Sequence, residues 1–248
     1  RVVAPELRVA DADPLAVAVI DAIRVGDTEA LRRHLREDPR LARARITSTR
    51  CDGDASRAML HVVADWPGHF PDGAASVRIL VEAGAHVDAR FEGRHQETAL
   101  HWAASSNDVS VLDALIDAGA DIEAPGAVIA GGTPLMDAVA FGQWRAARRL
   151  VERGARTDLW QSAALGLLDR VRTLISDGPH DAAEIDSAFW ASCHGGQLAT
   201  AQFLADQGAD VNFLPGWEPC TPLDAARRAE AFDVLSWLHT LRARSAAC

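Results

Sequence analysis

The side chains of this sequence that are best suited to acid–base chemistry are aspartate and histidine residues spread over its middle part. A pair of carboxyl groups such as Asp65 and Asp137 can divide the roles of acid and base, and a nearby histidine can move a proton near neutral pH. Aromatic rings at Trp66 and Trp102 could stabilise a cation. If the chain is an enzyme, the residues we select as catalytic are Asp65, His69, Asp137 and His194.

Three of the candidate side chains have a spacing that resembles a metal site on a helix. His61, Asp65 and His69 are four residues apart. Pro67 and Gly68 interrupt any helix between them, so His69 does not share a face with the other two. No close Cys/His pair has the spacing of a structural zinc site. We therefore predict no metal site.

Nucleophilic and phosphate-binding chemistry has equally little support. Cys193 is adjacent to His194, a base that could activate a thiol. The repeat alignment below puts Cys193 in a column of small alanines, so we interpret it as a core residue. The segment PGAVIAGGTP has glycines, but it lacks the lysine of a phosphate-binding loop. We predict no cofactor, and we leave enzymatic activity uncertain, leaning against it.

A unit that recurs along the chain must position these side chains. Gly-Ala closes the unit at residues 84–85, 119–120, 154–155 and 208–209, and SDGP at residues 176–179 takes the same place. The matching openings are MLHVVA from residue 59, TALHWAA from 98, TPLMDAVA from 133, DLWQSAA from 158, AFWASC from 188 and TPLDAA from 221. Such recurrence is typical of a repeat array.

Each unit reads as two short helices. In Thr-Pro-Leu, the threonine can cap a helix and the proline suits its first turn. In the unit at residues 98–124, apolar residues recur at helical spacing over two stretches, and Gly119 is expected to end the second helix in a left-handed conformation. Helices this short cannot bury an apolar face alone, so neighbouring units must stack. No strand pattern competes.

On these motifs the chain resembles ankyrin-repeat proteins, whose units of about 33 residues open with TPLHxAA. The resemblance implies an all-α solenoid of paired antiparallel short helices with finger loops. It also implies a binding or scaffold module that recognises a protein partner through its concave face. In that family the histidine of the opening is structural, which is how we interpret His61 and His101.

The resemblance divides the chain into three parts. Residues 1–50 are a leader and an N-terminal cap helix pair, residues 51–220 are ankyrin repeats, and residues 221–248 are a C-terminal capping repeat. The unit that opens at residue 59 contains an insertion, DWPGHFPDGAAS, and the unit from residue 158 lacks a finger loop. Later units replace the histidine of the opening, at Met136, Trp160, Trp190 and Asp224.

Aligned repeats place a mixed aromatic and polar strip on the concave face, in the column after the histidine and three positions further on. The residues we predict to bind there are Trp66, His95, Trp102, Ser105, Asp137, Phe141 and His194. Aromatic surface mixed with a few titratable groups is typical of binding sites. A small-molecule-binding protein or atypical enzyme, with a pocket on the second to fifth repeats, is therefore the alternative to a protein-binding module.

The amino-acid composition limits the classes of partner that the chain is expected to bind. The formal net charge is −10, and all 25 basic residues are arginine. An acidic chain with scattered arginine argues against nucleic-acid or membrane binding. The four cysteines form no pairs at motif spacing, so we expect free thiols and a cytoplasmic location, and the abundance of Ala and Arg without Lys favours a bacterial source.

Overall fold

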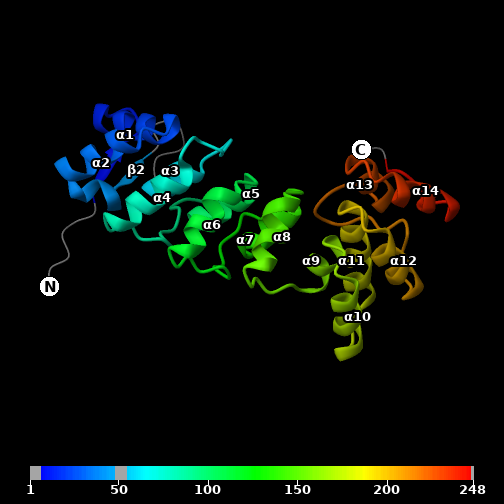
Figure 1. Cartoon of the computed structure of the whole chain (residues 1–248). Helices are drawn as coiled ribbons and strands as arrows, with labels where there is room; N and C mark the ends of the chain where they lie inside the picture. Colours follow the sequence, from blue (N-terminus) through cyan, green and yellow to red (C-terminus); the bar gives the residue numbers. More distant parts are fainter. Residues whose placement is uncertain (1–6, 48–54, 247–248) are drawn as a thin grey trace. The chain divides into compact units, whose positions relative to one another are not determined.

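The chain folds into two compact units, Arg1–Ala155 and Arg156–Cys248. The structure, a computed structural model, describes residues 7–47 and 55–246. Figure 1 shows the helices of the first unit in blue to green and those of the second in yellow-green to red. The predicted boundaries at residues 50 and 220 separate capping segments from repeats, which is a different division from that into compact units. These boundaries stay a prediction.

Paired helices make up most of the first unit. They are α1 (Pro14–Val25), α2 (Thr28–Glu37), α3 (Met59–Ala64), α4 (Gly73–Glu82), α5 (Ala99–Ser105), α6 (Val109–Asp117), α7 (Pro134–Ala140) and α8 (Trp144–Glu152). Helix α5 packs between α3 and α7, and α6 packs between α4 and α8. The first helices of successive pairs therefore form one layer and the second helices another, as in a solenoid.

Three short strands, which the sequence analysis did not predict, lie at the start of the first unit. They are β1 (Arg8–Ala10), β2 (Arg45–Thr47) and β3 (Ser56–Ala58), and a 3₁₀ helix, η1 (Pro39–Arg43), precedes β2. Strand β2 is central, parallel to β1 and antiparallel to β3. Strands of three residues are too short for an alternating pattern to identify them. An antiparallel bridge between Ser56 and Glu92 links this sheet to the next finger loop.

The second unit repeats the two-layer arrangement. Its helices are α9 (Leu159–Ala164), α10 (Leu168–Asp177), α11 (Ala182–His194), α12 (Leu198–Asp206), α13 (Pro222–Arg228) and α14 (Phe232–Thr240). Helix α11 packs between α9 and α13, and α12 contacts α10 and α14. Phe189 is fully buried in the core, with its ring centroid 6.2 Å from that of Trp237.

Three helix ends show where the expected local chemistry holds and where it does not. Thr133 caps α7 by accepting the amide of Met136, and Pro134 begins that helix. Gly119 has φ +93° after α6, the left-handed value expected there. Gly178 after α10 is extended instead, with φ −169°. The next residue is Pro179, which disfavours helical backbone at the residue before it.

Two histidines connect successive repeats, in agreement with their structural interpretation. The His61 Nε2 lies 3.0 Å from the carbonyl oxygen of Glu97, and the His101 Nε2 lies 3.4 Å from that of Gly132. The other ring nitrogen of His101 accepts a 3.1 Å hydrogen bond from the amide of Thr98, the residue that caps α5. Each histidine thus ties a first helix to the residue just before the cap of the next repeat.

The alignment of this histidine column is wrong at one position. Asp158 caps α9, and it exchanges hydrogen bonds with Gln161 as Thr98 does with His101. Gln161, and not Trp160, is therefore the equivalent of the histidine. The sequence motif was shifted by one residue because two consecutive large side chains fit the opening equally well.

Candidate functional site around Glu97 and Trp102

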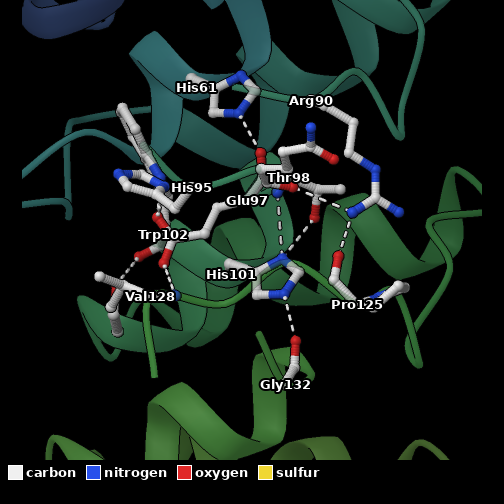
Figure 2. A network of polar contacts seen from close by, with 12 residues as sticks. His61, Arg90, His95, Glu97, Thr98, His101, Trp102, Pro125, Val128 and Gly132 are labelled. Atoms are coloured by element: carbon white, nitrogen blue, oxygen red, sulfur yellow. Dashed lines mark hydrogen bonds and ion pairs between the residues drawn. The ribbon is translucent and has the colours of Figure 1, made fainter. Parts of the chain in front are cut away.

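Glu97 lies at the centre of a polar network between two repeats (Figure 2). One carboxylate oxygen accepts a 2.8 Å hydrogen bond from the Trp102 indole, and the other accepts a 3.0 Å bond from the amide of Val128. The His95 Nδ1 lies 3.0 Å from one oxygen of the same carboxylate. Glu97 precedes the Thr98 cap of α5, so its side chain is fixed by the start of that helix. Its side chain is only 8% exposed.

Aromatic rings surround Trp102 and fix its orientation. The His61 ring meets it edge-on with centroids 4.9 Å apart, and the Phe91 centroid lies 5.7 Å away. Phe91 in turn stacks on His95 at 4.6 Å. Burial lowers the pKa of His61 to about 4, so this ring is neutral at neutral pH. Trp102 is thus held by an aromatic cluster and one hydrogen bond, with its remaining surface half-exposed.

Asp137 contributes a second buried carboxyl group. It lies in the first turn of α7 and has no solvent exposure. The backbone of Ile129 favours the charged form of this carboxyl group. Burial, and then the charge of Glu97 and a side-chain hydrogen bond to it, raise the pKa of Asp137 to about 8. Glu97 and Asp137 therefore form a buried acid pair.

A hollow next to Trp102 adjoins a second hollow on the surface. One has a volume of about 160 Å³ and is lined by Asp11, Ile46, Ala55, Ser56, Arg57, Phe91 and Trp102. The other, about 340 Å³, is lined by Asp11, Ala12, Val17, Ile20, Asp21, Arg24 and Arg57. Asp11 and Arg57 belong to both, so the hollows adjoin. We call the residues of both linings the Trp102 surface.

Three predicted site residues meet at Glu97. His95, Trp102 and Asp137 come from a finger loop, from α5 and from α7, and all three interact with the same carboxylate. Ser105 lies one turn beyond Trp102 on α5, and its hydroxyl donates to the Trp102 carbonyl at 3.1 Å. The Ser105 hydroxyl therefore bonds to the backbone of its own helix and does not take part in the Glu97 network.

Asp65, predicted as catalytic, is engaged elsewhere. Its carboxylate lies 2.7 Å from the Arg57 guanidinium and 3.6 Å from that of Arg24. The structure describes no contact between Asp65 and Asp137 or Glu97. Its carboxylate is therefore engaged by two guanidinium groups and not by the other predicted catalytic side chains. Asp65 instead sets the charge at the rim of the Trp102 surface.

His69, also predicted as catalytic, anchors the inserted loop at residues 65–72. Its amide donates to the Asp108 carboxylate at 2.7 Å, and its Nε2 lies 3.0 Å from the Ser106 carbonyl. Asp108 caps α6, so the loop docks on the next repeat. The insertion is shorter than the sequence motif, because α4 begins at Gly73 and takes its last four residues.

The other aromatic candidates are exposed. Trp66 in the inserted loop is 77% exposed, and Phe141 at the end of α7 is 48% exposed. No ring contact or hydrogen bond of either side chain is found within the described residues. Neither lines the hollows beside Trp102.

His194 belongs to the second unit. It is buried, and its ring stacks on Trp190 with centroids 5.2 Å apart. Its neighbour Cys193 is also fully buried, and burial raises the pKa of the thiol to about 12. An unreactive thiol agrees with the interpretation of Cys193 as a core residue. The predicted set Asp65, His69, Asp137 and His194 is thus engaged in separate local interactions.

The residue column expected on the concave face is mostly buried. Val62, Asp137, Ala191 and Ala225 have no solvent exposure, and only Trp102 is half-exposed. Most residues that follow the histidine column therefore belong to the packed interior of this chain rather than to its surface.

Sequence reasoning missed Glu97, Phe91 and Arg57. Glu97 immediately precedes the cap of α5, a position whose carbonyl links repeats but whose side chain is not fixed by the motif. The feature of the sequence that could have identified Glu97 is an acidic residue placed just before a helix that contains a large aromatic residue, Trp102. Arg57 lies in the unpredicted strand β3, so nothing in the pattern located it.

Within the described residues, no group of three or more His, Cys, Asp or Glu side chains is arranged to hold a metal ion. Over the same parts of the chain, none of the helices is long and apolar enough to cross a membrane.

The helix pairs, threonine caps and finger loops define an ankyrin-repeat fold. Residues 60–161 match the family model of ankyrin repeats (3 copies). The chain is similar to the human ASB11 ankyrin repeat domain, with a TM-score of 0.52 and 19% identity over 92% of this chain and 97% of that one. The predicted all-α solenoid of paired antiparallel helices is therefore confirmed.

A curated relative is similar over a shorter part of its own length. The mouse B-cell lymphoma 3 protein homolog is 32% identical over an alignment of 176 residues that covers 64% of this chain. The chain spans 38% of the length of that relative. Ankyrin-repeat domains are generally protein-interaction modules, and this chain contains such repeats.

Proposed function

We propose that the chain is a binding or scaffold module that recognises a protein segment through the concave face of its first unit, at the Trp102 surface. The observation that carries the proposal is the partly exposed Trp102 ring, which lines a hollow of about 160 Å³. Fixed aromatic rings with adjoining polar groups are typical of the residues that dominate binding energy at protein interfaces. The ankyrin-repeat fold supports the same class of function.

The size of the hollow favours a protein side chain over a small molecule. Small-molecule sites usually have volumes of about 300–1,000 Å³ and enclose most of the ligand. The hollow that Trp102 lines is smaller, at about 160 Å³, and its apolar lining includes Ile46, Phe91 and Trp102. The adjoining hollow of about 340 Å³ is large enough for a small molecule, but four of its seven lining residues are charged. One large apolar side chain of an extended segment would fill the hollow that Trp102 lines.

Charge at the adjoining hollow favours a basic neighbour on that segment. Asp11 and Asp21 line this hollow together with Arg24 and Arg57, and both arginines pair with Asp65. Among the described residues, the charges of both guanidinium groups are thus offset by Asp65 and by the carboxylates of the lining. The net negative charge of the chain acts in the same direction. We therefore propose a partner segment with a large apolar residue next to an arginine or lysine.

A display experiment tests this function. A random peptide library would be selected on the immobilised full chain, and selected peptides would be measured against the wild type, Trp102→Ala and Trp66→Ala. We expect an apolar-basic motif whose affinity falls at least about tenfold with Trp102→Ala. Trp66→Ala is a matched control, because Trp66 is exposed but lies outside both hollows.

Other results would reject the proposal. Peptides that bind both tryptophan variants as well as the wild type would place recognition elsewhere on the chain. Selection of acidic peptides would contradict the charge argument. Binding of a small molecule at Trp102, seen by native mass spectrometry of the purified chain, would favour the alternative function.

A further inference from the structure

A finger loop of the second unit exposes two large apolar side chains to solvent. The loop spans residues 207–220, between α12 and α13, and we call it the Trp217 loop. Leu214 is 55% exposed and Trp217 is 57% exposed. Single exposed apolar residues are common on protein surfaces, but neighbouring ones indicate an interaction site.

Aromatic contacts hold the Trp217 ring in place. It meets the Trp190 ring edge to face, with centroids 5.9 Å apart and planes at 84°. The Phe213 centroid lies 6.2 Å from that of Trp217, with the planes tilted by 58°. Trp190 is only 2% exposed, so it supports Trp217 and offers no contact surface of its own. Phe213 is half-buried, so parts of both tilted rings are accessible.

Both ends of the Trp217 loop are tied to α11. Near its start, the amide of Asp210 donates a 2.7 Å hydrogen bond to the carboxylate of Asp186 in α11. At its end, the carbonyl of Cys220 accepts the indole N–H of Trp190, from the same helix. A surface that is already ordered loses little conformational entropy on binding. The exposed rings are therefore preorganised for a partner.

The Trp217 indole also carries a hydrogen-bond donor. No hydrogen bond of this N–H is found within the described residues, whereas the indoles of Trp102 and Trp190 both donate to oxygen atoms. An exposed indole can pack an apolar group against its face and donate its N–H to a polar one. The best partner therefore combines compact apolar rings with unused backbone carbonyls.

A proline-rich segment in the polyproline II conformation has both properties. Its backbone makes no internal hydrogen bonds, so its carbonyls are available to an indole N–H. Its proline rings pack on aromatic side chains, and the preformed conformation limits the entropy lost on binding. An added β-strand would need the edge of a sheet, and the described residues of the second unit contain no strand.

Charge on the Trp217 loop favours a basic residue beside the prolines. The loop contains Asp210 and Glu218 but neither arginine nor lysine. Arg228 of α13 pairs with Glu218, and its guanidinium carbon lies 5.9 Å from the centroid of the Trp190 ring. Asp210 is exposed. A basic segment would be attracted to this loop, and an acidic one would be repelled.

We propose that the Trp217 loop docks a proline-rich protein segment that carries an arginine or lysine. The Trp217 ring contacts a proline ring of the segment, and its indole N–H donates to a backbone carbonyl. Leu214 adds apolar surface on the same loop. This docking surface belongs to the second unit and is independent of the Trp102 surface in the first.

Fluorescence anisotropy on the full chain tests the proposal with a labelled polyproline peptide flanked by arginines. A glutamate-flanked polyproline peptide controls for charge, and an arginine-flanked Gly-Ser peptide of equal length controls for proline. We expect the arginine-flanked polyproline peptide to bind, the glutamate-flanked one to bind more weakly, and the Gly-Ser peptide not to bind measurably.

Variants then locate the site. Trp217→Ala should weaken binding of the arginine-flanked polyproline peptide by at least about tenfold. Trp217→Phe keeps an aromatic ring and loses only the N–H donor, so it should weaken binding by about two- to tenfold. Trp102→Ala is the matched control and should bind this peptide as the wild type does. Urea unfolding of each variant separates lost binding from lost stability.

NMR keeps the proposal falsifiable if Trp217→Ala does not fold. The indole N–H signal of Trp217, assigned by its loss in Trp217→Phe, should shift when the arginine-flanked polyproline peptide is added to the wild type. An unmoved signal, no binding of that peptide, or equal binding of the Gly-Ser peptide would overturn the proposal. Loss of binding in Trp102→Ala but not in Trp217→Ala would assign the peptide to the first unit instead. Self-association that Trp217→Ala abolishes would show that a second copy covers the loop.

Discussion

The indole nitrogen of Trp190 donates a 2.8 Å hydrogen bond to the carbonyl oxygen of Cys220. Cys220 immediately precedes Thr221, the cap of α13, just as Gly132 precedes the cap of α7. Trp190 therefore makes the connection between repeats that His101 makes in the first unit. Indole has a single N–H and no acceptor nitrogen, so it supplies only the donor half of the histidine role.

Trp190→Phe should remove this donor while retaining an aromatic ring. The Cys220 carbonyl would lose the hydrogen bond from the indole, and we expect a cost of about 1–3 kcal/mol in the free energy of unfolding. Urea denaturation with an unchanged m-value would measure it. Trp160→Phe is the control, because no hydrogen bond of the Trp160 side chain is found in the described residues. Equal losses in both variants would show that ring size, and not the hydrogen bond, matters.

His61 should make the chain sensitive to acid. Its pKa is about 4 in the folded chain against 6.5 ordinarily, because burial disfavours the charged ring. The stabilisation is therefore present above pH 6.5 and is lost as pH falls towards 4. His61→Gln can still donate to the Glu97 carbonyl but cannot titrate. We expect the stability difference between wild type and His61→Gln to decline over that window, and a constant difference would contradict burial of a neutral ring.

Asp224 should make the stability of the chain depend on pH in a more acidic range than His61 does. Partial burial opposes ionisation, but hydrogen bonds from Ser245, Thr221 and the Ala246 amide lower its pKa to about 2. Its contribution is present above 3.8 and is lost as pH falls towards 2. Asp224→Asn should cost about 1–2 kcal/mol at neutral pH. Thermal unfolding should show this gap closing in acid, and an unchanged gap would refute the assignment.

The inserted loop offers a test with a matched pair of glycines. A Cβ at Gly68 would lie 2.9 Å from the Ser106 Cβ, whereas a Cβ at Gly131 would meet no atom within 4 Å. Both residues have a left-handed φ, +74° and +67°. Gly68→Ala should therefore destabilise the chain by about 1–3 kcal/mol more than Gly131→Ala. Hydrogen exchange at the start of α6 should rise only in Gly68→Ala, and similar exchange in both would argue against docking.

Much of the fold could be predicted because it depends on local signals. Threonine caps, proline at the first helical position and Gly119 specify where helices begin and end, and their recurrence requires stacking. The strands were not predictable, since β1 and β3 each pair with β2 across long separations in sequence. The bacterial source and cytoplasmic location remain predictions.

The candidate site was predicted in part. His95, Trp102 and Asp137 were selected, but the motif gave no reason to choose Glu97, which joins them. Its role depends on contacts between consecutive repeats rather than on any position within one. Asp65 and His69 were selected for spacing in sequence, whereas ion pairing with Arg57 and docking on Ser106 determine what they do.

The inserted loop also has a mechanical consequence. It contacts the repeat on either side: Pro71 lies against Gly26 after α1, and His69 is bonded to Ser106 and the Asp108 cap of α6. A solenoid pulled from its ends can unfold one repeat at a time, because each repeat contacts only its neighbours. Here the loop fastens three successive helix pairs together. Under tension in an optical trap, they should rupture in a single step rather than in sequence.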